Sequence, residues 1–307
     1  MTARATGPSG LLIVDKPGGL TSHDVVARVR RLAGTRRVGH AGTLDPMATG
    51  VLIVGIEKAT RLLGHLALTQ KEYAATIRLG ERTDSDDADG EILERLPAGG
   101  VTDAALRQAA AALTGEIQQV PPGISAIKVG GQRAYRLTRD GAPPELAART
   151  VTIAQLDITA IRRGTGEAGT ALDADALVTC SSGTYIRAIA RDLGAALGTG
   201  GHLTALRRTR VGPYRAADAA TLDELARADG PAALPVVPLA AAAAAAFAGR
   251  QLTADEARLI SHGGRLPALG AGPAPVAAFG PDGALIALLT EADGVARSLA
   301  VFAAGDT

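Results

Sequence analysis

The sequence has few of the residues that build disulfides, redox centres and aromatic clusters. Its 307 residues include one cysteine, Cys180, so no disulfide can form within the chain and no cysteine-based metal site is possible. Tryptophan is absent, and only four tyrosines and three phenylalanines occur. The cysteine usage fits a reducing cytoplasm. Because tyrosines are so few, a tyrosine in a polar context carries more information here than in an average protein.

Long apolar runs are also scarce. The N-terminal residues lack the apolar core of a signal peptide. One alanine-rich run spans residues 231–249, but Pro235 and Pro238 interrupt it, which makes it a poor membrane span. We interpret this run as a segment between domains, and we expect a soluble cytoplasmic protein that does not associate with membranes.

Several familiar ligand-binding motifs fail when their context is checked. GTGEAG at 164–169 has the spacing of a dinucleotide fingerprint, but an alternating, strand-like stretch follows it where the fingerprint requires a helix. The acidic run at 84–90 cannot be an EF-hand, because Leu96 occupies the position of the bidentate glutamate. Neither a phosphate-binding G-K-[ST] loop nor H-E-x-x-H occurs. A nucleotide-dependent oxidoreductase is therefore the least supported class, and GTGEAG is predicted to be a hairpin loop.

The formal net charge of +1 conceals a separation of charge along the chain. Residues 16–82 carry eleven Lys or Arg against five acids, and residues 181–215 carry six against one. Residues 83–105 hold seven acids and one base. The two basic stretches could converge into a surface for a polyanion such as nucleic acid, although ordinary solvated faces explain the charges about equally well.

The apolar periodicity predicts both strands and helices, and the length suggests two domains. Ser22 is the expected N-cap of a helix that ends at Gly34, and Thr102 is the expected N-cap of another that ends at Gly115. Residues 121–150 lack periodicity and resemble a long surface excursion. The other expected elements are strands at 11–14, 51–55, 73–79, 151–161 and 172–180, and helices at 184–197 and 253–261.

The stretch GHAGTLDPMATG at 39–50 is the sharpest candidate for a site. Pro46 restricts Asp45 to an extended conformation, and Gly42 and Gly50 flank it, so this carboxylate could be held rigidly at a cleft. Taken alone, an ordinary Asp-Pro turn is the commoner explanation. His40 in the same loop could stack on a base or replace one, but loop histidines are more often surface or capping groups.

Two tyrosines stand in polar surroundings. Tyr185 follows a Ser-Ser-Gly turn between a strand and a helix, and Arg187 lies two positions further on, where it could supply a fixed cation. Tyr73 lies between Lys71 and Arg78. Packing in the core is the default role of each tyrosine.

Five ordered motifs together resemble the bacterial tRNA pseudouridine synthase B family, which isomerises uridine 55 in the T-loop of tRNA. The resemblance covers almost the whole chain. The motifs are LLIVDKPGGLTSHDVV, RVGHAGTLDPMATGVLIV, KEYAATIRLGERTDSDDADG, QQVPPGISAIKVGGQRAYR and CSSGTYIRAIARDLGAALGTGGHLTALRRTRVGPY.

This resemblance implies a catalytic domain of mixed α/β (α+β) class over residues 1–240, built on a largely antiparallel sheet. Residues 121–150 would form an insertion that grips RNA, and residues 248–307 a small PUA-like, β-rich RNA-binding domain. The C-terminal segment has four arginines against six acids, which does not favour contact with phosphates.

The resemblance also implies roles for single residues. Asp45 falls on the family's nucleophile, and Arg187 on the arginine that pairs with it. Tyr73 is matched to a catalytic as well as a substrate-binding position. The other matches to substrate-binding positions are His40, Tyr185, Leu206, Asp87 and Lys16, which with Pro17 forms a structural pair near the site. Either tyrosine could stack on uracil or move a proton.

The resemblance calls for no metal and no cofactor. It implies tRNA, through its T-arm, as the partner, with no obligatory protein partner and a monomeric chain. A non-catalytic RNA-binding or RNA-folding protein would keep the basic surface but would not need Asp45, Tyr73 and Arg187 together. A guide-RNA-dependent synthase would be expected to need protein partners and often charged tails.

Overall fold

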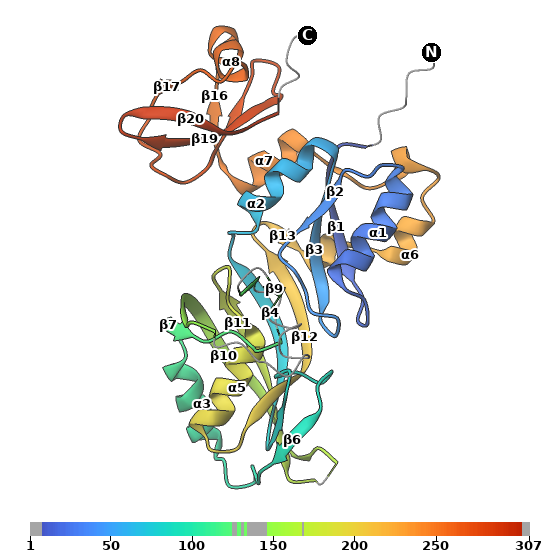
Figure 1. Cartoon of the computed structure of the whole chain (residues 1–307), viewed down its shortest axis with the longest axis vertical. Helices are drawn as coiled ribbons and strands as arrows, with labels where there is room; N and C mark the ends of the chain where they lie inside the picture. The colour runs from blue at the N-terminus through green and yellow to red at the C-terminus, as the bar shows by residue number, and fades with distance from the viewer. Residues whose placement is uncertain (1–7, 125–127, 130–131, 134–145, 168, 303–307) are drawn as a thin grey trace. The chain divides into compact units, whose positions relative to one another are not determined.

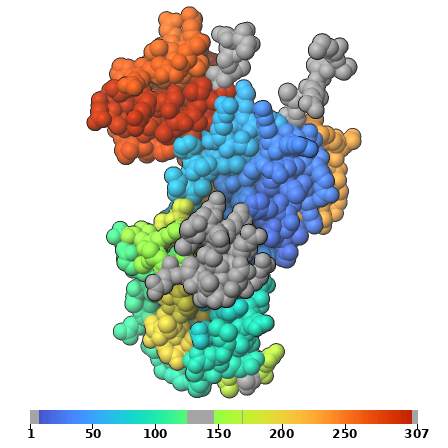
Figure 2. Space-filling view, in the orientation of Figure 1, coloured from blue at the N-terminus to red at the C-terminus, as the bar shows by residue number. Residues whose placement is uncertain are grey.

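The computed structural model describes residues 8–124, 128–129, 132–133, 146–167 and 169–302, and the remaining residues are drawn in grey in Figures 1 and 2. Contacts divide the chain into two compact units. The first unit comprises residues 1–45, 51–68 and 212–307, and the second comprises residues 46–50 and 69–211. Most of the excursion predicted at 121–150 lies outside the described residues.

The first unit contains the N-terminal strands and the helix expected after them. β1 (Gly10–Lys16) pairs in parallel with β14 (Ala220–Thr221) and antiparallel with β15 (Val237–Pro238). β2 (Val38–Ala41) pairs antiparallel with β3 (Thr49–Ile56). The remaining elements of this region are α1 (Ser22–Ala33), η1 (Glu57–Leu62), α2 (Leu63–Leu66), β13 (Tyr214–Arg215), η2 (Ala216–Asp218), α6 (Leu222–Ala226) and η3 (Pro231–Ala233).

Helix α1 shows how local sequence sets an element and how one prediction went wrong. Its N-cap is Thr21, not Ser22, because Thr21 and Asp24 form a reciprocal capping box. Gly34 ends the helix in the left-handed region, as expected. Val25, Val26 and Val29 are buried and pack in one core with Leu12, Val14 and Leu52. Ser22 instead bonds to the backbone of Leu44.

The second unit is built on five long or medium strands in the order β12-β4-β11-β10-β7. β4 runs antiparallel to both of its neighbours, and its residues from Lys71 to Leu79 are alternately buried and half-buried. Helices α3 and α5 cover the buried face (Figure 1). The bounds are β4 (Lys71–Leu79), α3 (Asp103–Ala112), β7 (Gly115–Gln119), β10 (Arg149–Thr165), β11 (Ala171–Cys180), α5 (Ile186–Ala196) and β12 (Gly201–Val211).

Shorter elements complete the second unit. β5 (Glu81–Thr83) pairs with β6 (Ile92–Arg95), and β8 (Lys128–Val129) pairs with β9 (Gln132–Arg133). The GTGEAG stretch connects β10 to β11, which confirms that it is a hairpin loop and not a dinucleotide fingerprint.

A separate five-stranded sheet follows near the C-terminus, in the order β16-β18-β19-β20-β17. Helix α8 packs on it, capped by Thr253 and Glu256. The bounds are α7 (Leu239–Ala246), β16 (Ala248–Gln251), α8 (Ala254–Ser261), β17 (Leu266–Pro267), β18 (Val276–Phe279), β19 (Leu285–Ala292) and β20 (Val295–Val301).

The predicted fold class is confirmed: the described residues form a large mixed sheet of 11 strands, rich in antiparallel pairs, and a small C-terminal β domain. The domain limits of 1–240 and 248–307 stay predictions. The alanine-rich run contains helix α7, which contacts β1 and β18. Within the part of the chain that the structure describes, no helix is long and apolar enough to cross a membrane.

Candidate active site

The loop that carries Asp45 is fastened to helix α1 just before the aspartate. The Leu44 amide donates a hydrogen bond to the Ser22 hydroxyl at 2.9 Å, and that hydroxyl donates one to the Leu44 carbonyl oxygen at 3.2 Å. Ser22 and Leu44 are both buried, and Gly42 adopts a φ of 71°. The half-buried Asp45 therefore follows a residue whose backbone is fixed through both of its polar groups.

The glycine at the far end of the loop is required by a close backbone contact. Gly50 has a φ of 100°, and a Cβ atom there would lie 2.2 Å from the carbonyl oxygen of Arg208. Thr49 and Gly50 pair in parallel with Arg207 and Arg208 of β12. A side chain at position 50 would break this pairing, so the spacing of glycines in the motif has a structural cause.

Two other predicted residues lie in the first unit. His40 is on β2, paired with Val54, and its ring meets the ring of His23 edge to face at 5.5 Å between centroids. Lys16 is fully buried, and its ammonium group donates to the carbonyl oxygens of Pro17 at 2.9 Å and Leu20 at 2.6 Å. These bonds give Lys16 a structural role in its own turn, and its proposed contact with substrate stays a prediction.

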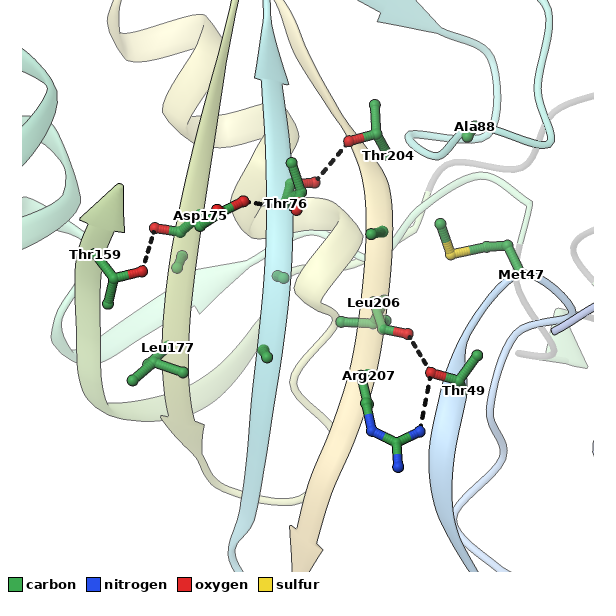
Figure 3. Close-up of a pocket in the computed structure, with 14 residues that line it drawn as sticks. Met47, Thr49, Thr76, Ala88, Thr159, Asp175, Leu177, Thr204, Leu206 and Arg207 are labelled. Carbon is green, nitrogen blue, oxygen red and sulfur yellow. Dashed lines mark hydrogen bonds between the residues drawn. The ribbon is translucent and has the colours of Figure 1, made fainter. Parts of the chain in front are cut away.

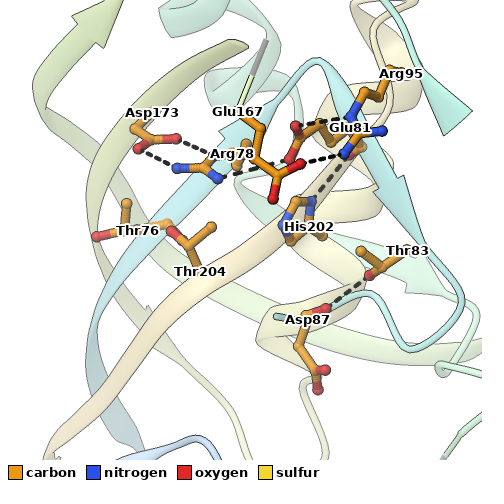
Figure 4. Close-up of polar contacts among 10 residues, drawn as sticks. All are labelled: Thr76, Arg78, Glu81, Thr83, Asp87, Arg95, Glu167, Asp173, His202 and Thr204. Atoms are coloured by element: carbon orange, nitrogen blue, oxygen red, sulfur yellow. Dashed lines mark hydrogen bonds and ion pairs between the residues drawn. The ribbon is translucent and has the colours of Figure 1, made fainter. Parts of the chain in front are cut away.

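Arg187 lies in the first turn of α5, where its guanidinium is almost completely buried. Its Nη1 donates to the Ser85 carbonyl oxygen at 2.8 Å and lies 3.4 Å from Asp87 Oδ2. Its Nη2 donates to the Ile124 carbonyl oxygen at 3.0 Å. Asp87 in turn accepts from the Ser85 hydroxyl at 2.5 Å, and Figure 4 shows the Thr83 hydroxyl on its backbone oxygen. The predicted residues Arg187 and Asp87 are thus brought together.

Tyr185 is the N-cap residue of the same helix, and its backbone is held by a side chain that sequence reasoning missed. The Tyr185 amide donates to Gln119 Oε1 at 2.8 Å, and Gln119 Nε2 donates back to the Tyr185 carbonyl oxygen at 3.1 Å. Gln119 is buried at the end of β7. A glutamine two residues before a Pro-Pro pair was the available signal, but its partner lies 66 residues away.

Tyr73 and Leu206 share the buried face of the sheet, as the register of β4 and β12 requires. Tyr73 lies opposite Arg208, and Leu206 opposite Ala75. Arg208 is the largest fully buried side chain in the described structure. Burial and the nearby positive charge of Arg208 lower the pKa of Lys71 to about 8. Two basic side chains, Lys71 and Arg208, are thus buried in the same region as Tyr73.

A cavity of about 520 Å³ lies over strands β10, β11, β4 and β12 of the second unit (Figure 3). Thr204, Thr76 and Asp175 form a hydrogen-bonded row across its floor. Met47, from the segment that follows Asp45, and Leu206 also line it. Because β4 alternates, Thr76 and its partner Asp175 lie on the outer face of the sheet, opposite the face that buries Tyr73.

The predicted site residues fall into two groups. Asp45, His40 and Lys16 belong to the first unit, and the second group, Tyr73, Asp87, Tyr185, Arg187 and Leu206, belongs to the second unit. The pairing of Arg187 with Asp45 stays a prediction. Among the residues that the structure describes, no group of three or more His, Cys, Asp or Glu side chains could hold a metal ion.

Comparison with known families gives a consistent result along the chain. Residues 30–186 match the N-terminal domain of the TruB family of pseudouridylate synthases. Residues 187–231 match the C-terminal domain of tRNA pseudouridylate synthase B, and residues 247–303 match the C-terminal part of tRNA pseudouridine synthase II.

Whole proteins with this sequence pattern are also similar over nearly their full length. The tRNA pseudouridine synthase B of Thermobifida fusca is 61% identical over 96% of this chain and 98% of its own. The protein of the same name from Streptomyces griseus is 57% identical over 99% of this chain and 100% of its own.

Solved structures extend the similarity to the fold. A chain in the crystal structure of a Cbf5-Nop10-Gar1 complex superposes with a TM-score of 0.73 at 27% identity, over 95% of this chain and 84% of its own. A chain of an H/ACA RNP bound to a substrate RNA containing 2′-deoxyuridine gives a TM-score of 0.71 at 26% identity, over 97% of this chain and 86% of its own. With the family matches, these similarities show that the chain belongs to the TruB family of pseudouridylate synthases.

Proposed function

We propose that the protein isomerises uridine 55 in the T-loop of tRNA to pseudouridine. The observation that carries this proposal is the high identity, over almost the whole chain, to bacterial proteins named tRNA pseudouridine synthase B. In this reaction the bond from N1 to C1′ breaks, the uracil rotates, and a bond forms from C5 to C1′. The proton on C5 leaves to water and N1 takes one up, so the reaction is redox-neutral.

Asp45 is the proposed nucleophile. The loop geometry supports this role, because Ser22 fixes the preceding residue and Gly50 allows the chain to return against β12. A carboxylate held in this way can take part covalently or stabilise charge while the base is detached. Arg187 is the proposed partner that orients Asp45, since its guanidinium is rigid and buried.

Tyr73, Tyr185, His40 and Leu206 are proposed to receive the flipped nucleotide. Uridine 55 is stacked in a folded loop, so it must leave the stack before the chemistry can occur, and aromatic and apolar side chains compensate for the lost stacking. Tyr73 and Leu206 lie on one face of the sheet, which supports a shared pocket. Asp87 is proposed to act from the edge of the site through Arg187.

The proposed partner is the T-arm of tRNA, bound by a monomeric chain in the cytoplasm without an obligatory protein partner. The two basic stretches at 16–82 and 181–215 would contact phosphates, so binding should weaken steeply with salt. The residues proposed for the chemistry are all side chains of this chain, and the isomerisation needs no external electron donor or acceptor.

The test is tritium release from an unmodified tRNA transcript labelled at uridine C5, with added chelator and no cofactor. Wild type should release tritium from a single site in the T-loop, and Asp45→Asn should release none while still binding tRNA. Asp255→Asn, an exposed aspartate on α8, is the matched control and should release tritium at the wild-type rate.

Two outcomes would change the proposal. Comparable release by Asp45→Asn would exclude Asp45 as the nucleophile. If wild type binds the tRNA but releases no tritium, the protein would instead be a non-catalytic RNA-binding or RNA-folding member of its family.

A further inference from the structure

Helix α5 carries a second arginine that contacts the acidic loop, although Arg191 is more exposed than Arg187 and also binds its neighbour Asp192 at 2.8 Å. Arg191 lies four residues on, which places it on the same face of the helix one turn later. Arg187 contacts Asp87, and Arg191 contacts the adjacent Asp86, each at 3.4 Å from nitrogen to oxygen. The two arginines therefore bind consecutive carboxylates of the acidic loop at 84–90.

The two arginines also share a second neighbour, the segment that leaves strand β7. Arg191 Nη2 donates to the Val120 carbonyl oxygen at 2.8 Å, as Arg187 Nη2 does to Ile124. Pro121 and Pro122 follow Val120 and have no amide hydrogen, so this segment cannot donate to a strand ladder there. The carbonyl oxygens of this segment can still accept hydrogen bonds, and those of Val120 and Ile124 accept them from Arg191 and Arg187.

We propose that Arg191 and Asp86 are positioning residues for the isomerisation, which lock the acidic loop and the 120–124 segment to α5 so that Arg187 is held in its working orientation. This inference rests on the proposed role of Arg187 in the site. It goes beyond that role because neither Arg191 nor Asp86 needs to touch the substrate.

The backbone at Asp86 supports a positioning role. Asp86 has a φ of 60°, a conformation that is unfavourable for a residue with a side chain, and its carbonyl oxygen accepts from the Leu203 amide of β12 at 3.0 Å. Its neighbours Ser85 and Asp87 both contact Arg187. A strained residue between two residues that hold Arg187 indicates that the surroundings fix this loop in one conformation.

The charges around Asp86 give the pair a dependence on pH. Arg191, Arg187 and Asp192 face it from α5, and Asp87 faces it from its own loop. Burial is the main cause that raises the pKa of Asp86 to about 6. Acidification through this range protonates Asp86 and removes its attraction for Arg191, so the orienting contact weakens on the acid side of neutrality.

The decisive experiment compares Arg191→Ala with Arg107→Ala in the tritium-release assay. Arg107 is a matched control, because it is also a helix arginine of the second unit that donates to a strand carbonyl, that of Ile158 at 2.5 Å, without touching the acidic loop. We expect Arg191→Ala to lower kcat on the order of tenfold to a hundredfold, as misplacement of a catalytic group does, with KM for tRNA nearly unchanged. Arg107→Ala should keep the wild-type kcat.

A pH series adds a readout that a purely structural role would not move. Wild-type kcat should fall as pH drops through about 6, the pKa of Asp86, whereas Asp86→Asn should have lost this acid limb. Asp89→Asn, an exposed change in the same loop, should keep the limb. Arg191→Lys should recover part of the lost rate, because it restores the charge without the two-pronged geometry.

Hydrogen exchange separates failure of this inference from failure of the proposed function. Amides of 115–124 should exchange faster in Arg191→Ala than in wild type or Arg107→Ala, whether or not the protein turns over tRNA. Wild-type kcat and unchanged exchange in Arg191→Ala would overturn the inference. Absence of tritium release from wild type itself would overturn the proposed function, and with it the catalytic part of this inference.

Discussion

The second unit contains two sets of arginine–aspartate pairs that differ in burial and in geometry. On the outer face of the sheet, Arg162 binds Asp175 through two hydrogen bonds, of 2.5 and 2.8 Å, although both side chains are more than a third exposed. In the acidic loop, Arg187 and Asp87 are 3.4 Å apart, and their side chains are only 5% and 6% exposed. The closer pair is therefore the more solvated one.

This difference teaches that contact distance is a poor guide to the importance of a charged pair. Water screens the outer pair, so its geometry adds little free energy. The inner pair has left water, and its charges act through a medium of lower dielectric constant, where Arg187 also depends on backbone carbonyl oxygens. We therefore expect function to reside in the inner set, and substitutions there to have larger effects than substitutions on the outer face.

Arg187→Ala should have the largest effect. It removes one partner of a buried pair, which typically costs about 3–5 kcal/mol of unfolding free energy. We also expect kcat to fall at least a hundredfold while tRNA affinity changes by less than about threefold, because the arginine is proposed to orient the nucleophile. Arg162→Ala is the matched change on the outer face. Turnover and urea unfolding should be measured for both variants. Equal effects of Arg187→Ala and Arg162→Ala would contradict the proposed difference between the buried and the exposed pair.

Asp86→Asn should change stability in a manner that depends on pH. The pKa of Asp86 in the folded protein is raised to about 6 from an ordinary 3.8, so its contribution to stability is present below pH 3.8 and is lost as pH rises through 6. Asparagine does not titrate. Between pH 4 and pH 7, the free energy of unfolding of the variant should therefore rise relative to that of wild type by up to about 3 kcal/mol. Urea unfolding at several pH values checks this, and a pH-independent difference would contradict it.

The local elements of this fold follow from the sequence to a large extent. The alternation in KEYAATIRL gives the burial pattern of β4, and glycine, proline and capping residues mark the loop around Asp45 and the ends of α1. The exact cap was mistaken, because Thr21 and Ser22 are chemically equivalent candidates. Only the distant contact of Ser22 with Leu44 shows which of the two is free to cap the helix.

The supports of the candidate site could not be predicted in the same way. Gln119 holds Tyr185 across 66 residues, and Arg191 reaches Asp86 across 105 residues. Such contacts depend on how strands and helices pack, and no local pattern encodes them. The four-residue spacing of Arg187 and Arg191 is compatible with one helix face, but it does not specify what that face meets.

Arg78→Ala should have an intermediate effect. Arg78 binds Asp173 at 2.8 and 3.0 Å and lies 3.7 Å from Glu81, and both carboxylates are mostly buried (Figure 4). Removing the guanidinium leaves two poorly solvated carboxylates, which should cost roughly 1–3 kcal/mol of unfolding free energy. Turnover should remain within about twofold of wild type, since no proposed site residue depends on this pair. A large loss of kcat without a loss of stability would mean that Arg78 takes part in function.

Arg162→Ala should have the smallest effect, and it defines the outer end of the comparison. Asp175 keeps its hydrogen bond from the Thr76 hydroxyl at 2.8 Å, so the carboxylate is not left without a protein donor. The hydrogen bonds of Arg162 hold the pKa of Asp175 below its ordinary value, and the variant should let that pKa rise towards it. NMR titration of Asp175 measures the rise, and urea unfolding at neutral pH should show no change beyond error. Because a measurable titration shift without a change in stability is the expected behaviour of a screened pair, a clear destabilisation here would mean that this face is covered by something that excludes water.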